Sequence, residues 1–356
     1  MFKALKQLHH IDLIKIGYTA PSNIALVKYW GKYPVQLPAN PSISFTLQNC
    51  KTETTLDVNR HSKSKNYFDV EVFVDGKIKT DFRPKIIQFF ERVEPYFSFL
   101  KDYAFKIETH NTFPHSSGIA SSASGFAALA ACLVGLEQKL TGEDVGDLNI
   151  SKTSFIARLG SGSASRSITG PMMLWGKHKD IAESQDDTAI TYHDVDAVFK
   201  TYQDVILLVD KGQKQVSSSV GHNLMNNHPF AKARFQQAHD NLSSLLPILQ
   251  NGDLERFIEI TESEALSLHA MMMCSQPYYI LMKPQTLQII EHIWNYRQET
   301  KIPVSFTLDA GANVHILFPK THKTKVLELI NTELIGYCQN EQYICDEIGQ
   351  GVKPLS

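Results

Sequence analysis

The chain has 356 residues, of which 43% are hydrophobic and 20% are charged, and its formal net charge is −2. This length favours two domains, and the composition is too apolar for a disordered protein. The slightly negative charge argues against a nucleic-acid-binding protein, because such proteins normally carry a basic excess.

The cysteines and the longest uncharged stretch both indicate a cytoplasmic protein. The five cysteines are widely spaced and form no C-x-x-C motif, so we expect neither a disulfide framework nor a structural zinc site. The first half of the stretch from Thr109 to Leu136 is mainly Ser, Gly and Ala with an early proline, which is too polar for a membrane core and predicts a buried helix instead. No secretory leader is recognisable. We therefore expect no membrane partner.

In the first half of the chain, alternating apolar and polar residues predict strands, and a longer apolar period predicts helices. The predicted strands are 42–47, 68–74, 105–108 and about 171–176. The predicted helices are 83–94, 120–140 and 151–159. Asp75-Gly76, which follows the second strand, is typical of a hairpin turn.

The second half is mostly helical, with short strands at both ends. The predicted helices are 230–249, 253–273 and 283–299, and the predicted strands are 205–210, 304–309 and 314–318. The polar segment from Glu183 to Asp187 suggests a boundary near 185–205, between a domain of residues 1–195 and a domain of residues 196–356. The order of strands and helices predicts two α+β domains rather than a regular βαβ array.

A loop of small residues precedes the helix predicted at 120–140. It runs from Pro114 to Ala123 and contains mainly Ser, Gly and Ala. A helix N-terminus presents unpaired backbone N–H groups, and small side chains let a phosphate approach them closely. The alternative is a tightly packed helix start with serine caps. A second loop, Arg158 to Arg166, ends in a guanidinium whose geometry matches phosphate or carboxylate oxygens. The alternative for this loop is a flexible turn.

Four motifs together resemble the diphosphomevalonate decarboxylase family of the GHMP kinase superfamily. They are Asn23 to Lys32 (NIALVKYWGK), Asn111 to Leu129 with the first small-residue loop, Gly160 to Ser167 (GSGSASRS), and Thr307 to Asn313 (TLDAGAN). They occur in the order of the family over most of the chain.

The resemblance implies a two-domain GHMP kinase fold, with a ribosomal-S5-like N-terminal domain, a ferredoxin-like C-terminal domain and an active site in the cleft between them. It implies that ATP and Mg²⁺ are used to convert mevalonate 5-diphosphate to isopentenyl diphosphate, in isoprenoid biosynthesis by the mevalonate pathway. In this reaction the 3-hydroxyl is phosphorylated, and phosphate and CO₂ are then lost. Members of the family are commonly homodimers.

Asp309 is the predicted catalytic acid. Alternation in 304–309 puts Ser305, Thr307 and Asp309 on one strand face, with Asp309 at the strand end. By resemblance this carboxylate orients and deprotonates the substrate hydroxyl; the alternative is an ordinary turn aspartate. The resemblance also places Lys28 beside Asp309.

The substrate residues come from three segments. By resemblance, Tyr29 and Lys32 bind the diphosphate, and Arg166 is a catalytic anchor for the carboxylate or diphosphate, with Ser161 and Ser163 as further donors. Arg83 is a further candidate, whereas Arg158 is predicted to be structural. For the two lysines the alternative is a solvated surface position, and Trp30 could be core.

The first small-residue loop supplies the predicted ATP site. Its residues are Asn111, Pro114, Ser116, Ser117, Gly118, Ala120, Ser121 and Ser122. The resemblance makes Ser122 a candidate Mg²⁺ ligand.

The chain departs from the family pattern at Tyr33 to Leu37, where the usual segment is longer and carries an arginine and an acid. Smaller departures are His115-Ser116-Ser117, Ser165 and Ala312. The first departure leaves mevalonate 5-phosphate or mevalonate open as the substrate. Two other functions therefore stay open: a GHMP-type small-molecule kinase that stops at phosphorylation, and a non-catalytic binding protein.

Overall fold

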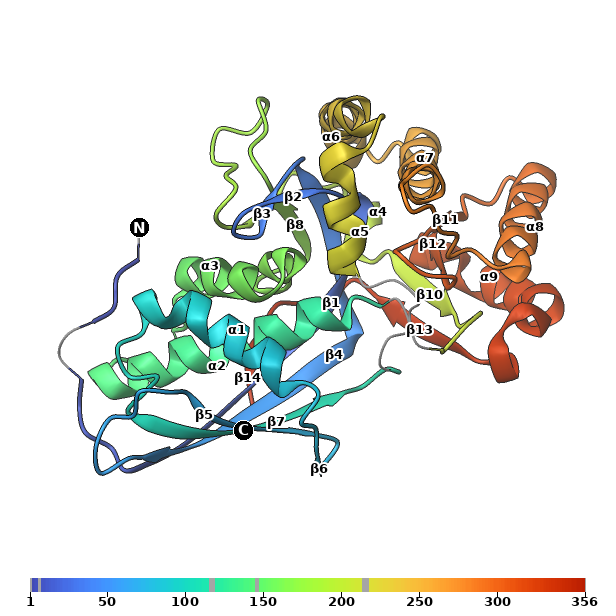
Figure 1. Ribbon diagram of the computed structural model, residues 1–356. Coiled ribbons are helices and arrows are strands. Elements are labelled where there is room, and N and C mark those ends of the chain that lie inside the picture. Colours follow the sequence, from blue (N-terminus) through green and yellow to red (C-terminus); the bar gives the residue numbers. More distant parts are fainter. Residues whose placement is uncertain (1, 6–7, 115–118, 145–146, 213–217, 356) are drawn as a thin grey trace.

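The computed structural model describes residues 2–5, 8–114, 119–144, 147–212 and 218–355. Among these residues the strands form an eight-stranded sheet, a four-stranded sheet and a two-stranded hairpin. Helices pack against both larger sheets (Figure 1), so the chain has the α+β organisation that the sequence predicts.

The larger sheet is built around two long antiparallel strands, β1 and β4. Its order is β14-β1-β4-β7-β5-β6, while β8 pairs with the beginning of β4, and β9 pairs with β8. The strands are β1 (Leu13–Val27), β4 (Ser42–Arg60), β5 (Asp69–Val74), β6 (Lys77–Ile78), β7 (Tyr103–Asn111), β8 (Met172–Trp175), β9 (Ile190–Thr191) and β14 (Lys353–Pro354). The hairpin between β1 and β4 consists of β2 (Lys32–Tyr33) and β3 (Leu37–Pro38).

Three helices cover one face of the larger sheet (Figure 1). They are α1 (Arg83–Val93), α2 (Ser121–Thr141) and α3 (Ile150–Gly160), and the short helices η1 (Glu94–Tyr96) and η2 (Gly162–Ser167) follow α1 and α3. The central helix α2 is buried along almost its whole length, so the apolar stretch that could have suggested a membrane span is core. In the described part of the chain, no helix is long and apolar enough to cross a membrane.

The smaller sheet has the antiparallel order β11-β12-β10-β13. Its strands are β10 (Gln203–Leu207), β11 (Ser305–Thr307), β12 (Val314–Phe318) and β13 (Tyr343–Glu347). The helices of this half are α4 (Ala197–Lys200), α5 (Ser218–Leu224), α6 (Ala231–Asn251), α7 (Leu254–Met273), α8 (Pro284–Thr300) and α9 (Lys323–Leu329). Short helical turns are η3 (Met225–Asn227), η4 (Lys320–His322), η5 (Ile330–Leu334), η6 (Ile335–Tyr337) and η7 (Gln339–Glu341).

The predicted helices are confirmed within about two residues at each end, and the predicted hairpin turn is present. Asp75 and Gly76 have φ angles of 51° and 71°, as the turn between β5 and β6 requires. The strand predicted at 42–47 is only the beginning of the 19-residue β4. Strand β1 was not predicted. It contains Pro21, and its second half is buried on both faces, so it lacks the alternation that marks a half-buried strand.

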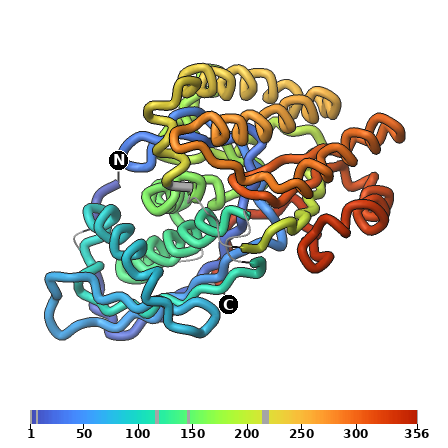
Figure 2. Tube along the Cα trace, turned by 45° about the vertical axis from the view of Figure 1, so that its right-hand side comes forward, coloured from blue at the N-terminus to red at the C-terminus, as the bar shows by residue number. Residues whose placement is uncertain are grey.

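The two sheets are joined by a carboxylate and by the C-terminal segment. Asp346 on β13 accepts hydrogen bonds from the backbone N–H groups of Gln48, Asn49 and Cys50 in β4, at 2.9, 2.8 and 2.7 Å. After β13 the chain returns to the larger sheet, where β14 pairs with β1. Figure 2 shows the green helices α2 and α3 and the yellow and orange helices α6 and α7 in separate parts of the molecule. The boundary between residues 195 and 196 stays a prediction.

Candidate active site

Asp309 follows the end of β11 and lies next to the end of β1. Its backbone oxygen accepts hydrogen bonds from Gly311 N at 2.7 Å and from His269 Nε2 on α7 at 3.1 Å. These bonds fix the turn that presents the carboxylate. The Asp309 side chain is 23% exposed, and its Oδ1 lies 3.4 Å from Lys28 Nζ. The structure therefore brings together a partly accessible acid and a lysine 281 positions away in sequence.

Lys28 is buried, and a network from α6 and α7 holds its backbone. Its N–H donates to Glu264 Oε2 at 2.8 Å, and its carbonyl accepts from Asn40 Nδ2 at 2.9 Å. Glu264 forms a buried ion pair with Arg234. Burial lowers the pKa of Lys28, while the neighbouring Asp309 carboxylate opposes that change. The ammonium group is thus desolvated and depends on Asp309 for electrostatic compensation.

Arg166 lies in η2 and is 3% exposed, and its three hydrogen-bond partners are neutral side chains. Its Nε donates to Ser44 Oγ at 3.1 Å, and its two terminal nitrogens donate to Ser42 Oγ at 2.6 Å and Asn23 Oδ1 at 3.3 Å. The guanidinium carbon also lies 5.9 Å from the Trp175 ring centroid. Burial lowers its pKa to about 10, and the charge of Asp309 opposes this.

None of the ion pairs among the described residues includes Arg166. A buried charge without an opposite charge in contact is costly, and an anionic ligand would relieve that cost. The arrangement therefore favours binding of a carboxylate or phosphate beside Asp309.

The segment that contains Arg166, which is η2 with the preceding residue Ser161, also presents small polar groups. Ser161 Oγ and Ser163 Oγ lie 3.4 Å apart. The hydroxyl of Tyr29 is buried without a hydrogen-bond partner among the described residues, and a Cβ at Gly162 would come within 2.7 Å of it. Gly162 thus lets the loop approach Tyr29 closely. The unused phenol O–H is a donor that a bound anion could satisfy.

A second group of cations, here called the lysine–arginine cluster, consists of Lys32, Lys85 and Arg92. Burial and the charge of Arg92 lower the pKa of Lys32. Desolvation and the charge of Lys32 lower the pKa of Lys85. Lys32 therefore lies close enough to each of the other two cations for mutual repulsion. None of the ion pairs among the described residues includes any of them, so the cluster can attract an anion with several charges.

Sequence reasoning missed Lys85 and Arg92. They are seven residues apart on α1, and this spacing puts them on one helix face. The seven-residue spacing can be recognised in the sequence, but nothing in the sequence indicates that this helix face lies near Lys32. Arg83, the predicted residue of this segment, donates its Nε–H to Val70 O at 3.0 Å. Its role in substrate binding stays a prediction.

The start of α2 is described only in part. Ser116, Ser117 and Gly118 lie outside the described residues. Ala120 precedes the helix in the left-handed conformation, at φ 46°, which is uncommon for alanine. Ser122 Oγ accepts a hydrogen bond from Lys85 Nζ at 3.1 Å, which links α2 to the lysine–arginine cluster.

Two further residues brace the segment before α2. Asn111 Oδ1 accepts from Thr52 Oγ1 at 2.7 Å, which shapes the strand that leads into the loop. Ser22 Oγ donates to Ile119 O at 2.5 Å, and so ties the end of the loop to β1. Ser121 is the first residue of α2, and Asn111 is connected to the first turn of α2 through Thr52, whose Oγ1 also lies 2.6 Å from Ser124 Oγ.

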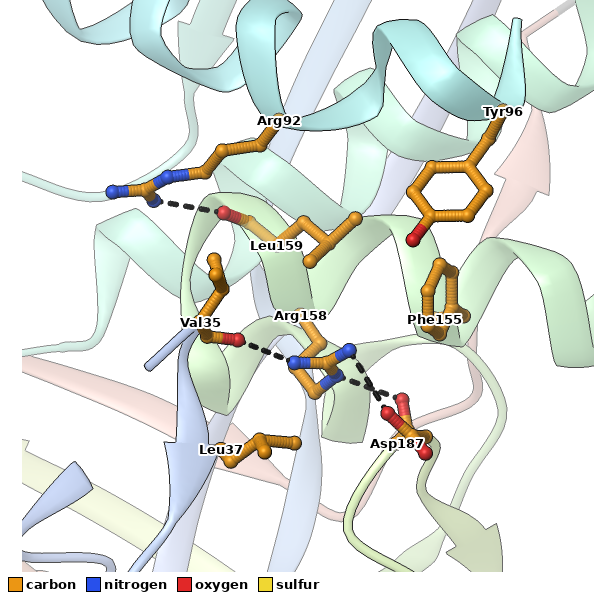
Figure 3. A pocket seen from close by; sticks show the side chains of 8 residues that line it. All are labelled: Val35, Leu37, Arg92, Tyr96, Phe155, Arg158, Leu159 and Asp187. Atoms are coloured by element: carbon orange, nitrogen blue, oxygen red, sulfur yellow. Dashed lines mark hydrogen bonds and ion pairs between the residues drawn. The ribbon is translucent and has the colours of Figure 1, made fainter. Parts of the chain in front are cut away.

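The hairpin that departs from the family pattern is fixed to the end of α3. Arg158 donates to Val35 O at 2.6 Å, to Asp187 O at 2.9 Å and to Asp187 Oδ1 at 3.1 Å (Figure 3). The structural role predicted for Arg158 is confirmed. A cavity of about 280 Å³ lies beside these contacts, and Arg92 borders it while donating to Leu159 O at 2.9 Å.

Comparison with known proteins places this geometry in a family. Residues 20–189 match the family model of the diphosphomevalonate decarboxylase-like N-terminal domain, and residues 204–352 match that of the mevalonate 5-diphosphate decarboxylase C-terminal domain. The diphosphomevalonate decarboxylase of Aspergillus fumigatus is 30% identical over 321 residues, which cover 84% of this chain and 76% of that protein. The chain belongs to the diphosphomevalonate decarboxylase family.

Two further comparisons bear on the fold and on the substrate. A solved structure of MDDEF in complex with MVAPP, AMPPCP and magnesium is 28% identical, with a TM-score of 0.80 over 97% of this chain and 99% of that one. The chain therefore has the two-domain fold of this decarboxylase family. The phosphomevalonate decarboxylase of Haloferax volcanii is 27% identical over 311 residues, which cover 86% of this chain and 88% of that protein.

His269 gives this decarboxylase family member a testable dependence on pH. Burial lowers the pKa of His269 to about 4, whereas an unfolded histidine titrates near 6.5. The unfolded chain therefore takes up a proton that the folded chain rejects, so the stability that His269 provides is complete above pH 6.5 and is lost as the pH falls towards 4. Between pH 7 and pH 5 this loss is about 2 kcal/mol.

The variant His269→Gln keeps a donor for the backbone oxygen of Asp309 but cannot titrate. We expect urea unfolding to show that it loses about 2 kcal/mol less than the wild type when the pH is lowered from 7 to 5. Equal losses for the two proteins would contradict this explanation.

Proposed function

We propose that this chain catalyses the ATP-dependent decarboxylation of mevalonate 5-diphosphate to isopentenyl diphosphate, as an enzyme of isoprenoid biosynthesis. The observation that carries the proposal is the arrangement of Asp309, Lys28 and Arg166, in which a partly accessible carboxylate lies 3.4 Å from a buried lysine and close enough to a buried guanidinium to oppose the lowering of its pKa. A protein that only binds its ligand does not need a carboxylate directed at a ligand hydroxyl. An enzyme that transfers a phosphoryl group does need one, because the acceptor hydroxyl has to be oriented for attack.

Asp309 and Lys28 act on the acceptor alcohol. Asp309 orients the tertiary hydroxyl and accepts its proton as the γ-phosphoryl group of ATP is transferred. Lys28 holds this carboxylate in place, because Lys28 Nζ lies 3.4 Å from Asp309 Oδ1 and the ammonium group is buried. Phosphorylation converts a poor leaving group into a good one, and loss of phosphate then develops positive charge at the carbon.

Arg166 binds the other end of the reacting carbon skeleton. Its buried guanidinium holds the substrate carboxylate or diphosphate, and this carboxylate leaves as CO₂ when phosphate departs. Tyr29, Lys32, Ser161 and Ser163 bind the diphosphate. Support comes from the unpartnered Tyr29 hydroxyl and from the absence of Lys32 from the ion pairs of the described residues. Arg83 is retained as a further candidate ligand.

The start of α2 is proposed as the ATP site, with Asn111, Pro114, Ala120, Ser121 and Ser122 among its residues. Ser122 fits a magnesium ligand, because its hydroxyl is at the helix start and Mg²⁺ often takes few protein ligands in addition to phosphate oxygens. Among the described residues, no group of three His, Cys, Asp or Glu side chains could hold a metal ion. When bound with ATP, Mg²⁺ would neutralise charge that develops on the transferred phosphoryl group.

We further infer that the enzyme is cytoplasmic and works as a homodimer. The cysteines are all free, and three of them are buried, which suits a reducing compartment. The dimer rests on the resemblance to the family, and sedimentation at several protein concentrations tests it.

A second substrate, mevalonate 5-phosphate, is favoured by one specific observation. The segment from Tyr33 to Leu37 departs from the diphosphomevalonate decarboxylase pattern, and the similar Haloferax protein is named a phosphomevalonate decarboxylase. This segment lies next to Lys32, so it could change the number of phosphates that the site accepts.

One assay separates the alternatives. The protein is incubated with ATP, Mg²⁺ and, separately, mevalonate, its 5-phosphate and its 5-diphosphate, and ADP and CO₂ are measured together. We expect equal amounts of ADP and CO₂ with the 5-diphosphate. The same result with the 5-phosphate alone would establish the second substrate. ADP without CO₂ would show a kinase, and no ADP with any of the three would refute catalysis.

Asp309→Asn tests the catalytic acid. The amide keeps the shape of the side chain but cannot accept the proton, so we expect turnover to fall by about 10² to 10⁴ while ATP binding is retained. Steady-state kinetics and titration with an ATP analogue measure the two quantities. Near-normal turnover would remove Asp309 from the mechanism.

Arg166→Lys tests the buried guanidinium. Lysine keeps the charge but loses the planar fork, so it cannot donate to Ser42, Ser44 and Asn23 while also binding an anion. We expect kcat/KM for the decarboxylation substrate to fall by about 10- to 100-fold. Wild-type kcat and KM for this variant would show that the fork is not used.

A further inference from the structure

A buried histidine, His222, lies between two aromatic residues of the site, and the mechanism above does not use it. His222 is on α5 and is 8% exposed. Its ring centroid lies 4.3 Å from that of Tyr29 and 4.7 Å from that of Trp30. The imidazole is therefore held in place by two rings of the segment that also carries Lys28 and Lys32.

Hydrogen bonding fixes which nitrogen of His222 carries the proton. The backbone N–H of Gly31 donates to Nδ1 at 3.0 Å, so Nδ1 is the acceptor and the proton of the neutral ring is on Nε2. No hydrogen bond from this Nε2–H to another described residue is present. Burial, followed by the charges of Lys32 and Arg166, lowers the pKa of His222 to about 3. The ring is thus neutral at physiological pH and retains one unused donor.

The surroundings of His222 are those of an anion site. Lys32 and Arg166 lie close enough to affect its titration, and Tyr29 lies between it and the loop that carries Gly162. A further cation here would repel Lys32 and Arg166, whereas a neutral N–H donor adds a hydrogen bond without that repulsion. Hydrogen bonds to charged groups are stronger than those between neutral groups.

We propose that the Nε2–H of His222 donates a hydrogen bond to a phosphate oxygen of the substrate, and that His222 is thereby an uncharged determinant of specificity for the phosphorylated end. This inference rests on the proposed function, because it takes the substrate to be a mevalonate phosphate ester. The alternative is a purely structural histidine, whose only contribution is to accept the hydrogen bond from Gly31 and to fill space between two rings.

Two variants separate these roles, because each retains only one of the two hydrogen-bonding functions of the ring, the acceptor at Nδ1 or the donor at Nε2. His222→Asn places an acceptor where Nδ1 accepts from Gly31 but removes the donor at the Nε2 position. His222→Gln keeps an N–H donor at the Nε2 position. Calorimetric titrations with mevalonate 5-diphosphate and with mevalonate give the dissociation constants for wild type and both variants, and steady-state assays give kcat and KM.

We expect His222→Asn to bind mevalonate 5-diphosphate about tenfold more weakly than wild type, with a raised KM and little change in kcat. Its affinity for mevalonate, which has no phosphate, should be unchanged. His222→Gln should stay close to wild type with both ligands. Unchanged affinity of the Asn variant for the diphosphate would overturn the proposal, as would equal weakening of both ligands in both variants.

A measurement on the wild type covers the case in which a variant does not fold. Nitrogen-15 NMR of the histidine rings should show a downfield shift of the His222 Nε2–H proton on addition of mevalonate 5-diphosphate, and no such shift with mevalonate. An unchanged resonance in the saturated protein would overturn the inference. Failure of the proposed function is distinguishable from failure of this inference, because the wild type itself would then release no CO₂ from mevalonate 5-diphosphate.

Discussion

The site depends on cationic side chains that are buried without enough negative charge around them. Arg166 is enclosed by two serine hydroxyls and an amide oxygen, and the Lys28 ammonium has one carboxylate, Asp309, at 3.4 Å. Burying a charge costs free energy unless an opposite charge compensates it. The folded chain therefore has uncompensated positive charge in the site, and an anionic substrate can compensate it. This local positive charge explains how a protein of net charge −2 can bind a polyanion.

The fold maintains this arrangement through contacts between its two sheets. Glu264 on α7 accepts the N–H of Lys28 and pairs with Arg234 on α6, so the end of β1 is fixed by helices from the second half of the chain. Asp346 joins β13 to β4 in a similar way. Because Lys28 comes from one half and Asp309 from the other, their separation reports directly on how the halves are joined. His222 contributes from a third segment, since it accepts the N–H of Gly31.

Much of this could be predicted from sequence where the signal is local. The alternation in 304–309 placed Asp309 at a strand end, and the small residues before α2 marked the start of that helix. The contribution of Glu264 could not be predicted, because it acts on a backbone group 236 positions away. Lys85 and Arg92 were missed for a related reason. Their spacing places them on one face of α1, but the proximity of that face to Lys32 depends on tertiary packing. Strand β1 was missed because its buried half has no alternation.

In the proposed mechanism, the uncompensated guanidinium of Arg166 and the carboxylate of Asp309 together recognise the reacting part of the substrate. A crystal structure with mevalonate 5-diphosphate and a non-hydrolysable ATP analogue tests it most directly. We expect the substrate carboxylate or diphosphate to lie within hydrogen-bond distance of Arg166, and the tertiary hydroxyl to contact Asp309. A substrate bound with its hydroxyl directed away from Asp309, and with Arg166 still contacting only Ser42, Ser44 and Asn23, would contradict it.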